Sequence, residues 1–386
     1  MFYYMKKLLE KGWVKYKLYF FIICVAILAI YFYGKIDYTK EEFRNWDSHQ
    51  YVKMAKAVPK IDDTIPRPFS FRLLGPYLIG LLTDQYEIGF YIFNVMASIF
   101  FIIIFLEFLC YFKIRRSIAS IIIIFYILNK HFFGFTSWNF FHINDVLMNI
   151  IFIILFWSLL EGRWVIYTVA LLLGSVTREP FLIIIPVTFF YLIENKKFRK
   201  HALRLILYIL PAIICFLLIR IYITPTSGLM LSDAFYRFSD KIFNMRGLFK
   251  FFINPFVPLS LIPIIYYEKT ILFFKEHKYM ILYVILVFFS ALFGSNYERL
   301  AHPSFIVFYL LIAVIIQESN LNKKRIITTL LIFTYLSSFH YLIGRFKLPD
   351  RNTTIILSGG SFILVTIVIF IYRMIMNRKL PTIIEA

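Results

Sequence analysis

The chain has 386 residues, of which 60% are hydrophobic, and it carries a formal net charge of +20. Soluble domains are only about 45–50% apolar, and long apolar runs recur here from end to end, so the composition excludes a soluble protein. A strongly basic membrane protein favours anionic lipid surfaces and anionic lipid-linked ligands over nucleic acid. No long polar stretch leaves room for a separate soluble domain. We therefore predict one all-α, polytopic membrane domain over residues 1–386.

Charged and turn residues divide the apolar runs into about twelve predicted transmembrane segments. No small-residue cleavage site follows the first run, so we expect an uncleaved transmembrane helix there and not a signal peptide. Segments such as 181–193 and 255–267 are shorter than the about 20 residues that a perpendicular span needs. The segments are 18–34, 86–112, 117–133, 144–160, 164–177, 181–193, 204–223, 255–267, 279–294, 303–317, 326–344 and 354–376.

Lysine and arginine in short loops predict the orientation of the segments. With twelve segments, both termini and the main basic clusters fall on one side, which we expect to be cytoplasmic. The opposite side then carries two longer loops, residues 35–85 and 224–254. Few glycines and many Ile, Lys, Phe and Tyr residues are typical of an AT-rich bacterial genome. The expected location is thus the bacterial inner (plasma) membrane, with a multi-pass topology.

The first external loop is the longest polar stretch of the sequence. Thr39 suits the N-cap of a helix over about residues 40–57, whose apolar positions predict an amphipathic helix at the membrane interface. Asp47 and Tyr51 are four residues apart and share one face of that helix. The segment 73–83 is too short to span a bilayer, and we expect it to lie at the interface or to dip into it.

Arg67 and Arg72 bracket a Pro-aromatic turn in the same loop. Two arginines in this setting are able to hold a phosphate at the membrane surface, because each guanidinium binds two oxygens and stays charged. The alternative is that they anchor the chain by binding lipid head groups.

Three further external corners carry ionisable residues, which are costly at membrane depth and therefore suggest a functional site. If the fold gathers them, they would form one polar, water-accessible cavity. Their structural alternatives are a helix cap at the first corner and ion pairs at the other two. The corners are His142, Asn144 and Asp145; Thr177, Arg178, Glu179 and Pro180; and Asn296, Tyr297, Glu298, Arg299 and His302.

This arrangement resembles the C-type membrane glycosyltransferases, multi-span enzymes that take a sugar from a polyprenyl-phosphate carrier on the outer face. The resemblance implies a GT-C-like fold with an interfacial helix in the first external loop. The sequence departs from that family in having Ser48, and not a second acid, after Asp47. The motifs that carry the resemblance are Trp46-Asp47-Ser-His-Gln-Tyr51, Pro68-Phe-Ser-Phe-Arg72-Leu-Leu-Gly-Pro76, Thr177-Arg178-Glu179-Pro180, and Glu298-Arg299 before Pro303.

The resemblance implies transfer of a sugar from a polyprenyl-phosphate donor to a cell-surface glycan, lipid or protein acceptor. Asp47 inherits the role of catalytic base, and we expect its pKa to be raised beside apolar surface. The candidates for binding substrate or phosphate are Arg67, Arg72, Arg178, Arg299 and Tyr51. The supporting candidates, which would orient these groups or hold a divalent metal ion (Mg or Mn), are His142, Asp145, Glu179, Glu298 and His302. Metal dependence is left open, because the ligand types fit but their spacing is not diagnostic.

Two other function classes stay open. A transporter or flippase of lipid-linked sugars would show internal repeats and broken segments at the bilayer midplane, and no convincing repeat is visible. A glycan polymerase or ligase would place its key residues in a large late external loop. The loop 224–254, with Arg237, Lys241, Arg246 and Lys250, keeps that alternative open.

Overall fold

The computed structural model is all-helical over the residues that it describes and has no strand among them. The predicted second external loop, including its four basic residues, lies almost wholly outside the described part, so its role is not tested. The described residues are 2–43, 46–196, 198–223, 235–236, 238–239, 252–293, 297–319, 321 and 323–378.

Within the described residues, five helices are long and apolar enough to cross a membrane, and a bent pair would make six. The chain is therefore a membrane protein by the length and composition of its helices, and twelve spans are not established. The five are α1 (Phe2–Tyr33), α4 (Tyr86–Tyr111), α7 (Ile143–Glu161), α10 (Phe198–Tyr222) and α19 (Arg351–Arg378). Shorter apolar helices are α8 (Trp164–Thr177), α15 (Lys278–Ala291) and α17 (Phe305–Glu318) with the turn before it. The bundle also contains the short helices α9 (Ile184–Glu194) and α18 (Lys324–Ser338).

Two predicted segments are broken in the structure. The segment 117–133 consists of α5 (Arg116–Ile127) and a π-helical turn, η3 (Lys130–Gly134), which continues into α6 (Phe135–Trp138), and the two parts meet at an angle of 51°. The Asn129 side chain holds the break, because its oxygen accepts backbone N–H bonds from His131 and Phe132.

The segment 255–267 is not one helix, and a span there is not confirmed. The structure divides it into η5 (Asn254–Phe256), α13 (Ile262–Ile265) and the start of α14 (Tyr267–Glu276). Prolines at positions 255, 258 and 263 explain the division, because proline lacks the N–H that a continuing helix needs.

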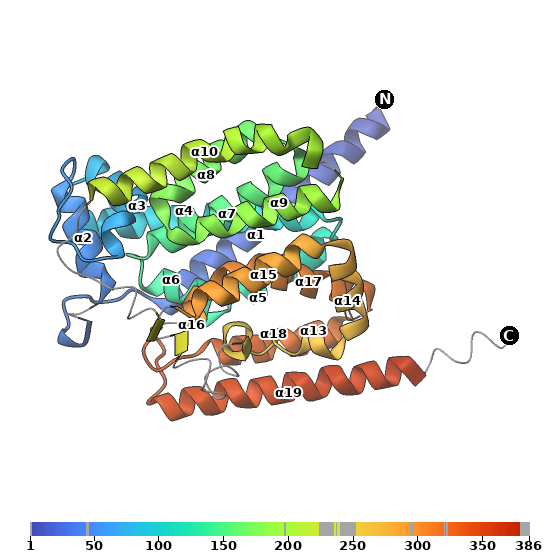
Figure 1. The fold of residues 1–386 in the computed structure, drawn as a ribbon. Coiled ribbons are helices and arrows are strands. Elements are labelled where there is room, and N and C mark those ends of the chain that lie inside the picture. Colours follow the sequence, from blue (N-terminus) through green and yellow to red (C-terminus); the bar gives the residue numbers. More distant parts are fainter. Residues whose placement is uncertain are drawn as a thin grey trace.

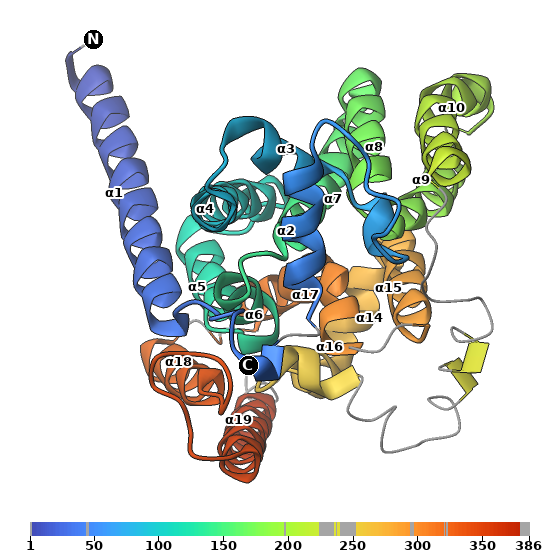
Figure 2. The ribbon, with the colours of Figure 1, turned by 90° about the vertical axis from the view of Figure 1, so that its left-hand side faces the viewer.

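The helices run side by side between two ends of the molecule (Figure 1). The start of α1 and the end of α19 lie at one end, and the short elements α2 (Asp47–Ala57), α3 (Leu74–Leu82) and α16 (Tyr297–Leu300) lie at the other. Helix α7 is central, with 78% of its apolar stretch buried, whereas only 17% and 22% of the apolar stretches of α10 and α19 are buried. Apolar helices that bury so little of their surface are suited to face lipid. Helices α18 and α19 pack together at one edge of the bundle (Figure 2).

The two short helices predicted in the first loop are present, although the first begins later than expected. Helix α2 starts at Asp47, and Thr39 does not cap it, because the Thr39 hydroxyl donates to Asp37 Oδ1 at 2.6 Å. Helix α3 packs on α2 so closely that a Cβ atom on Gly80 would overlap the carbonyl oxygen of Ala55. This close packing fixes the position of α2, and therefore of its first residue.

Replacing Gly80 by Ala is expected to destabilise the protein by about 1–3 kcal/mol, because the added methyl group overpacks the α2–α3 contact. Gly360→Ala is the matched control, since a Cβ atom at this helical position meets no atom within 4 Å. The thermal unfolding midpoint of both variants in detergent micelles measures the effect. Equal midpoints for the two variants would contradict the close packing of α2 on α3.

Candidate functional site

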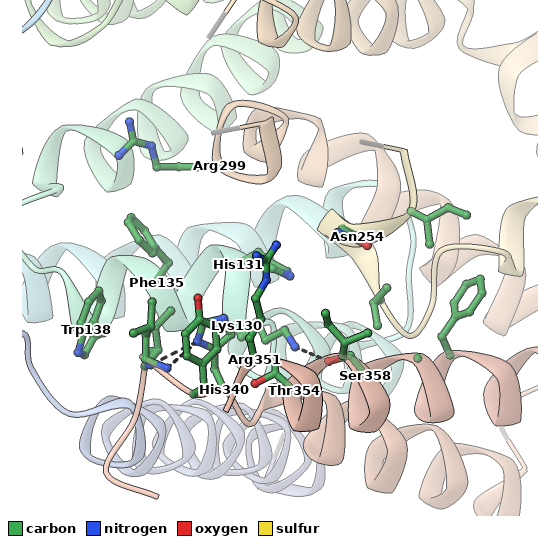
Figure 3. Close-up of a pocket in the computed structure, with 18 of the residues that line it drawn as sticks. Lys130, His131, Phe135, Trp138, Asn254, Arg299, His340, Arg351, Thr354 and Ser358 are labelled. Atoms are coloured by element: carbon green, nitrogen blue, oxygen red, sulfur yellow. Dashed lines mark hydrogen bonds between the residues drawn. The ribbon is translucent and has the colours of Figure 1, made fainter. Parts of the chain in front are cut away.

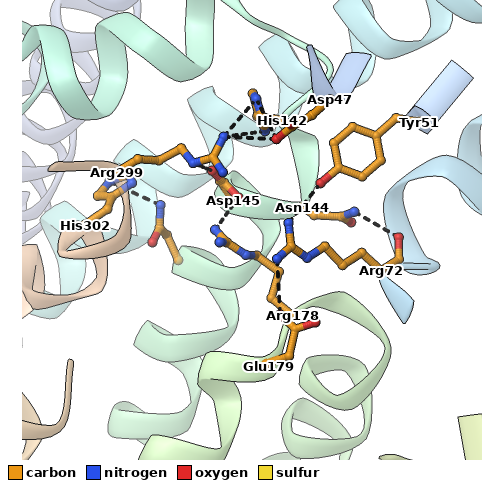
Figure 4. Close-up of polar contacts among 11 residues, drawn as sticks. Asp47, Tyr51, Arg72, His142, Asn144, Asp145, Arg178, Glu179, Arg299 and His302 are labelled. Carbon is orange, nitrogen blue, oxygen red and sulfur yellow. Dashed lines mark hydrogen bonds and ion pairs between the residues drawn. The ribbon is translucent and has the colours of Figure 1, made fainter. Parts of the chain in front are cut away.

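Polar residues from the four predicted corners meet at the end of the bundle that carries α2 and α3 (Figure 4). Each of them lies at or near the end of a helical element, so short backbone segments set their positions. Asn144 ties two corners together, because its Nδ2 donates to the carbonyl of Arg72 at 3.0 Å and its Oδ1 accepts from the N–H of Gly75 at 2.9 Å. Asn144 therefore bonds to the start of α3, and the interpretation of it as the cap of its own helix is wrong.

Arginines and carboxylates alternate through this cluster. Arg299 Nη1 lies 3.3 Å from Asp47 Oδ2, and Arg299 Nε lies 3.7 Å from Asp145 Oδ2. Asp145 Oδ1 in turn accepts a short hydrogen bond from Arg178 Nη1. The sequence-based alternative of a pair between Arg178 and its neighbour Glu179 is thus replaced by a pair between two different helices.

A second row of charges adjoins the first. Arg72 Nη2 lies 3.4 Å from Glu179 Oε2, and Arg72 Nη1 donates to the Tyr51 hydroxyl at 3.4 Å. Arg220 Nη2 lies 3.6 Å from Glu179 Oε1, and the Arg220 guanidinium stacks 4.7 Å from the centre of the Phe71 ring. Arg220 was not among the predicted site residues, because an arginine near the end of a long apolar segment is also typical of a packing or interface residue.

The described cluster has an excess of positive charge, with four guanidinium groups facing three carboxylates. Arg178 and Asp145 are 6% and 3% exposed and form the buried part of the cluster. Asp47 is 25% exposed and Arg299 is 16% exposed, so these two groups are within reach of a ligand. An excess cation in a partly buried site favours an anionic ligand.

The pKa of Asp47 is lowered and not raised, which corrects the sequence-based expectation. Burial alone would raise the pKa of this carboxyl, but His142, Arg299 and Arg72 together outweigh the burial. His142 is neutral at neutral pH, so the two arginines are what keep Asp47 ionised there. Asp47 is therefore a carboxylate that stays charged and is ready to accept a proton.

His142 lies against both partners of the Asp47–Arg299 pair. Its Nε2 is 3.7 Å from Asp47 Oδ2 and accepts a hydrogen bond from Arg299 Nη1 at 3.1 Å. Arginine only donates hydrogen bonds, so the ring nitrogen that faces it carries no proton. Burial and the charge of Arg299 lower the pKa of His142 to about 4, which agrees with a neutral ring.

Acidification is expected to destabilise the protein between about pH 6.5 and pH 4, by up to about 3 kcal/mol from His142 alone. The pKa of His142 is lower in the folded state, so its contribution is complete above pH 6.5 and is lost as the pH falls. The lowered pKa of Asp47 acts in the same direction at still lower pH. Thermal unfolding across this pH range measures the effect, and His142→Asn should flatten the dependence. An unchanged pH dependence in that variant would assign the effect to other groups.

Three predicted site residues lie apart from the cluster or outside the described part. Arg67 is exposed, and no polar contact among the described residues joins it to the cluster. The side chain of Glu298 lies outside the described part. His302 is buried beneath the cluster, where it bonds to the Tyr126 hydroxyl at 2.9 Å and stacks on the Phe132 ring at 4.3 Å, so it packs as a core residue. Over the described residues, no group of three His, Cys, Asp or Glu side chains is arranged to hold a metal ion.

A cavity of about 670 Å³ adjoins the cluster (Figure 3). Arg299 lines the cavity and also pairs with Asp47, so this arginine belongs to both the cavity and the cluster. Trp46, Phe135 and Trp138 form an aromatic part of its wall, and Lys130 and Arg351 add positive charge. The sequence analysis missed the cavity, although Lys130 and His131 inside an apolar run were a signal for it.

Comparison with known proteins finds no relative of this chain. The sequence matches no family model, and no curated protein or solved structure is significantly similar to it.

Proposed function

We propose that the protein is an integral membrane glycosyltransferase of the GT-C type. In this proposal it moves a sugar from a polyprenyl-phosphate carrier to a glycan, lipid or protein acceptor on the outer face of the bacterial inner membrane, with both termini cytoplasmic. The observation that carries the proposal is the Asp47–Arg299 pair, a carboxylate and a guanidinium 3.3 Å apart beside a large cavity.

Glycosyl transfer to a hydroxyl acceptor requires a base, stabilisation of the departing phosphate, and exclusion of water. The acceptor oxygen bonds to the anomeric carbon, the bond from that carbon to the phosphate oxygen breaks, and the phosphate leaves with the electron pair. Asp47 takes the hydroxyl proton. A carboxylate of low pKa is able to do so late in the reaction, because the hydroxyl becomes strongly acidic once its oxygen has begun to bond to carbon.

Arg299 is assigned to the leaving phosphate, since a guanidinium binds two phosphate oxygens and stays charged throughout. His142 is a positioning residue, because its neutral ring touches both Asp47 and Arg299. Aromatic residues around the cavity are suited to exclude water and to pack on a sugar ring.

The test is transfer of radiolabelled sugar in proteoliposomes that contain the full-length protein. A panel of polyprenyl-phosphate sugars serves as donor, and total cell-envelope extract serves as acceptor. Label in a product that is not carrier-bound, and only when the protein is present, supports the proposal. Absence of transfer across the panel contradicts it.

One observation favours a second function, a transporter or flippase of lipid-linked sugars. Transporters often carry a broken helix beside the substrate site, and the 51° break between α5 and α6 brings Lys130 and His131 to the cavity wall. The same proteoliposomes discriminate the two functions. Movement of a fluorescent polyprenyl-phosphate sugar between the leaflets, without transfer of the sugar, would identify a transporter.

A further inference from the structure

The charged side chains that line the cavity are all of one sign. They are Lys130, Arg299 and Arg351, and no Asp or Glu is found among the described lining residues. Arg299 is paired with Asp47 and Asp145. The positive charge that Lys130 and Arg351 bring to the cavity is not balanced by any described acid in its wall.

Lys130 is the most unusual of these cations, because only 6% of the residue is exposed. It is the first residue of the η3 turn, where the chain changes direction after α5. Its ammonium group donates a short hydrogen bond to the Ser358 hydroxyl of α19, and it forms no ion pair with a described carboxylate. A buried ammonium without a counter-ion is unfavourable, so its presence at a cavity wall indicates a place for an anion.

Hydrogen-bond donors surround the same region. His340 Nδ1 accepts backbone N–H bonds from Leu342 at 3.0 Å and from Ile343 at 3.4 Å. The neutral ring therefore carries its proton on Nε2. Ser358 of α19 places a hydroxyl group on the cavity wall, whereas the Thr354 hydroxyl one turn earlier donates to the carbonyl of Asp350 at 3.4 Å. Cations and neutral donors together suit a phosphate, which has several acceptor oxygens.

Most of the remaining wall is apolar, and part of it lies on the exposed side of α19. Ile355 and Phe362 of α19 line the cavity, and Ile355 is 57% exposed. Exposed apolar side chains continue along α19 at Ile356, Ile363 and Ile367. An amphiphile with an anionic head in the cavity would therefore have an apolar surface along which to extend its chain.

We propose that this cavity binds the phosphate of a polyprenyl-phosphate amphiphile, with Lys130 and Arg351 as phosphate ligands beside Arg299. The proposal rests on the proposed function for the identity of the amphiphile. It replaces Arg72 and Arg178, favoured by the sequence, as the main phosphate ligands. It also gives the α18–α19 pair a role, because Arg351 and Ser358 lie on α19.

Binding of tritiated farnesyl phosphate to the purified full-length protein in detergent tests the proposal. Lys130→Met and Arg351→Gln are each expected to weaken binding about tenfold or more, the loss that follows removal of one charged hydrogen bond. Lys130→Arg keeps the charge and should lose less binding than Lys130→Met, because a guanidinium also binds phosphate oxygens. Lys347→Gln, at an exposed position between α18 and α19, is the matched control and should bind as wild type does.

Competitors distinguish the sources of the phosphate. Farnesol and inorganic phosphate are each expected to compete at least about tenfold more weakly than unlabelled farnesyl phosphate, because each lacks one half of the ligand. Phosphatidylglycerol competing as well as farnesyl phosphate would identify a lipid head-group site and overturn the proposal. Absence of farnesyl phosphate binding, or wild-type binding by both Lys130→Met and Arg351→Gln, would also overturn it.

The binding assay is independent of sugar transfer, so the two proposals fail separately. If binding depends on Lys130 and Arg351 but no sugar is transferred, this inference stands and the glycosyltransferase proposal fails. If sugar is transferred but binding does not depend on these residues, the glycosyltransferase proposal stands and this inference fails.

Discussion

Asp47→Asn is expected to reduce sugar transfer by about 10²–10⁴-fold, the range typical for loss of a general base. Asparagine keeps the shape of the side chain but is unable to accept the proton of the acceptor hydroxyl. It also removes the negative charge 3.3 Å from Arg299, so the guanidinium loses the partner that orients it. Initial rates of transfer from a polyprenyl-phosphate sugar, measured in proteoliposomes at equal protein content, give the effect.

Asp63→Asn is the matched control, because Asp63 is an exposed acid in the same loop and should be dispensable. Both variants must reach wild-type levels in the membrane and elute as a single species in detergent. If Asp47→Asn keeps more than about a tenth of wild-type transfer, the base lies elsewhere. Asp47 would then be a structural partner of Arg299 and His142.

Arg178→Gln is expected to destabilise the protein by about 3–5 kcal/mol, which is the cost of leaving a buried charge without its partner. Asp145 is only 3% exposed, and Arg178 is its short hydrogen-bond partner. Loss of Arg178 would also move Arg299, whose Nε lies 3.7 Å from the same carboxylate. The thermal unfolding midpoint and the yield after detergent extraction measure the effect.

Arg163→Gln provides the comparison, since Arg163 pairs with Glu161 at 2.6 Å but is 63% exposed. Loss of such an exposed pair should cost no more than about 1 kcal/mol. The double variant Asp145→Leu with Arg178→Met removes both charges, and it is expected to be more stable than Arg178→Gln. A single variant as stable as Arg163→Gln would show that solvent reaches the Arg178–Asp145 pair.

The polar end of the molecule has a structural part and a proposed catalytic part. The buried Arg178–Asp145 pair holds the surrounding helix ends in place, and Arg299 extends from it toward Asp47 on one side and the cavity on the other. A change in the Arg178–Asp145 pair should therefore mainly reduce the stability of the protein. A change at Asp47 should mainly reduce sugar transfer, with little effect on stability. The ratio of the two effects across the variants tests this division.

The sequence by itself determined the class of the protein and the side chains at its polar end. Long apolar runs predict membrane helices because hydrocarbon forces backbone groups to bond within the same segment, and this depends on local composition alone. In the same way, ionisable residues next to apolar runs marked Asp47, Arg72, Asp145, Arg178 and Arg299, and the structure brings all five together. The number of spans could not be predicted as well from the sequence. Prolines and the Asn129 side chain break segments that are continuously apolar in the sequence.

Only the tertiary structure decided which of these residues are partners and what each partner does to the other. Asp47 and Arg299 are 252 residues apart in the sequence, and no local pattern links them. Their contact lowers the pKa of Asp47, where the apolar surroundings alone would raise it. Lys130 and Arg351 likewise share a cavity only because α19 packs beside the break after α5. Electrostatic effects depend on distance in space, and in a helical membrane protein helix packing sets that distance.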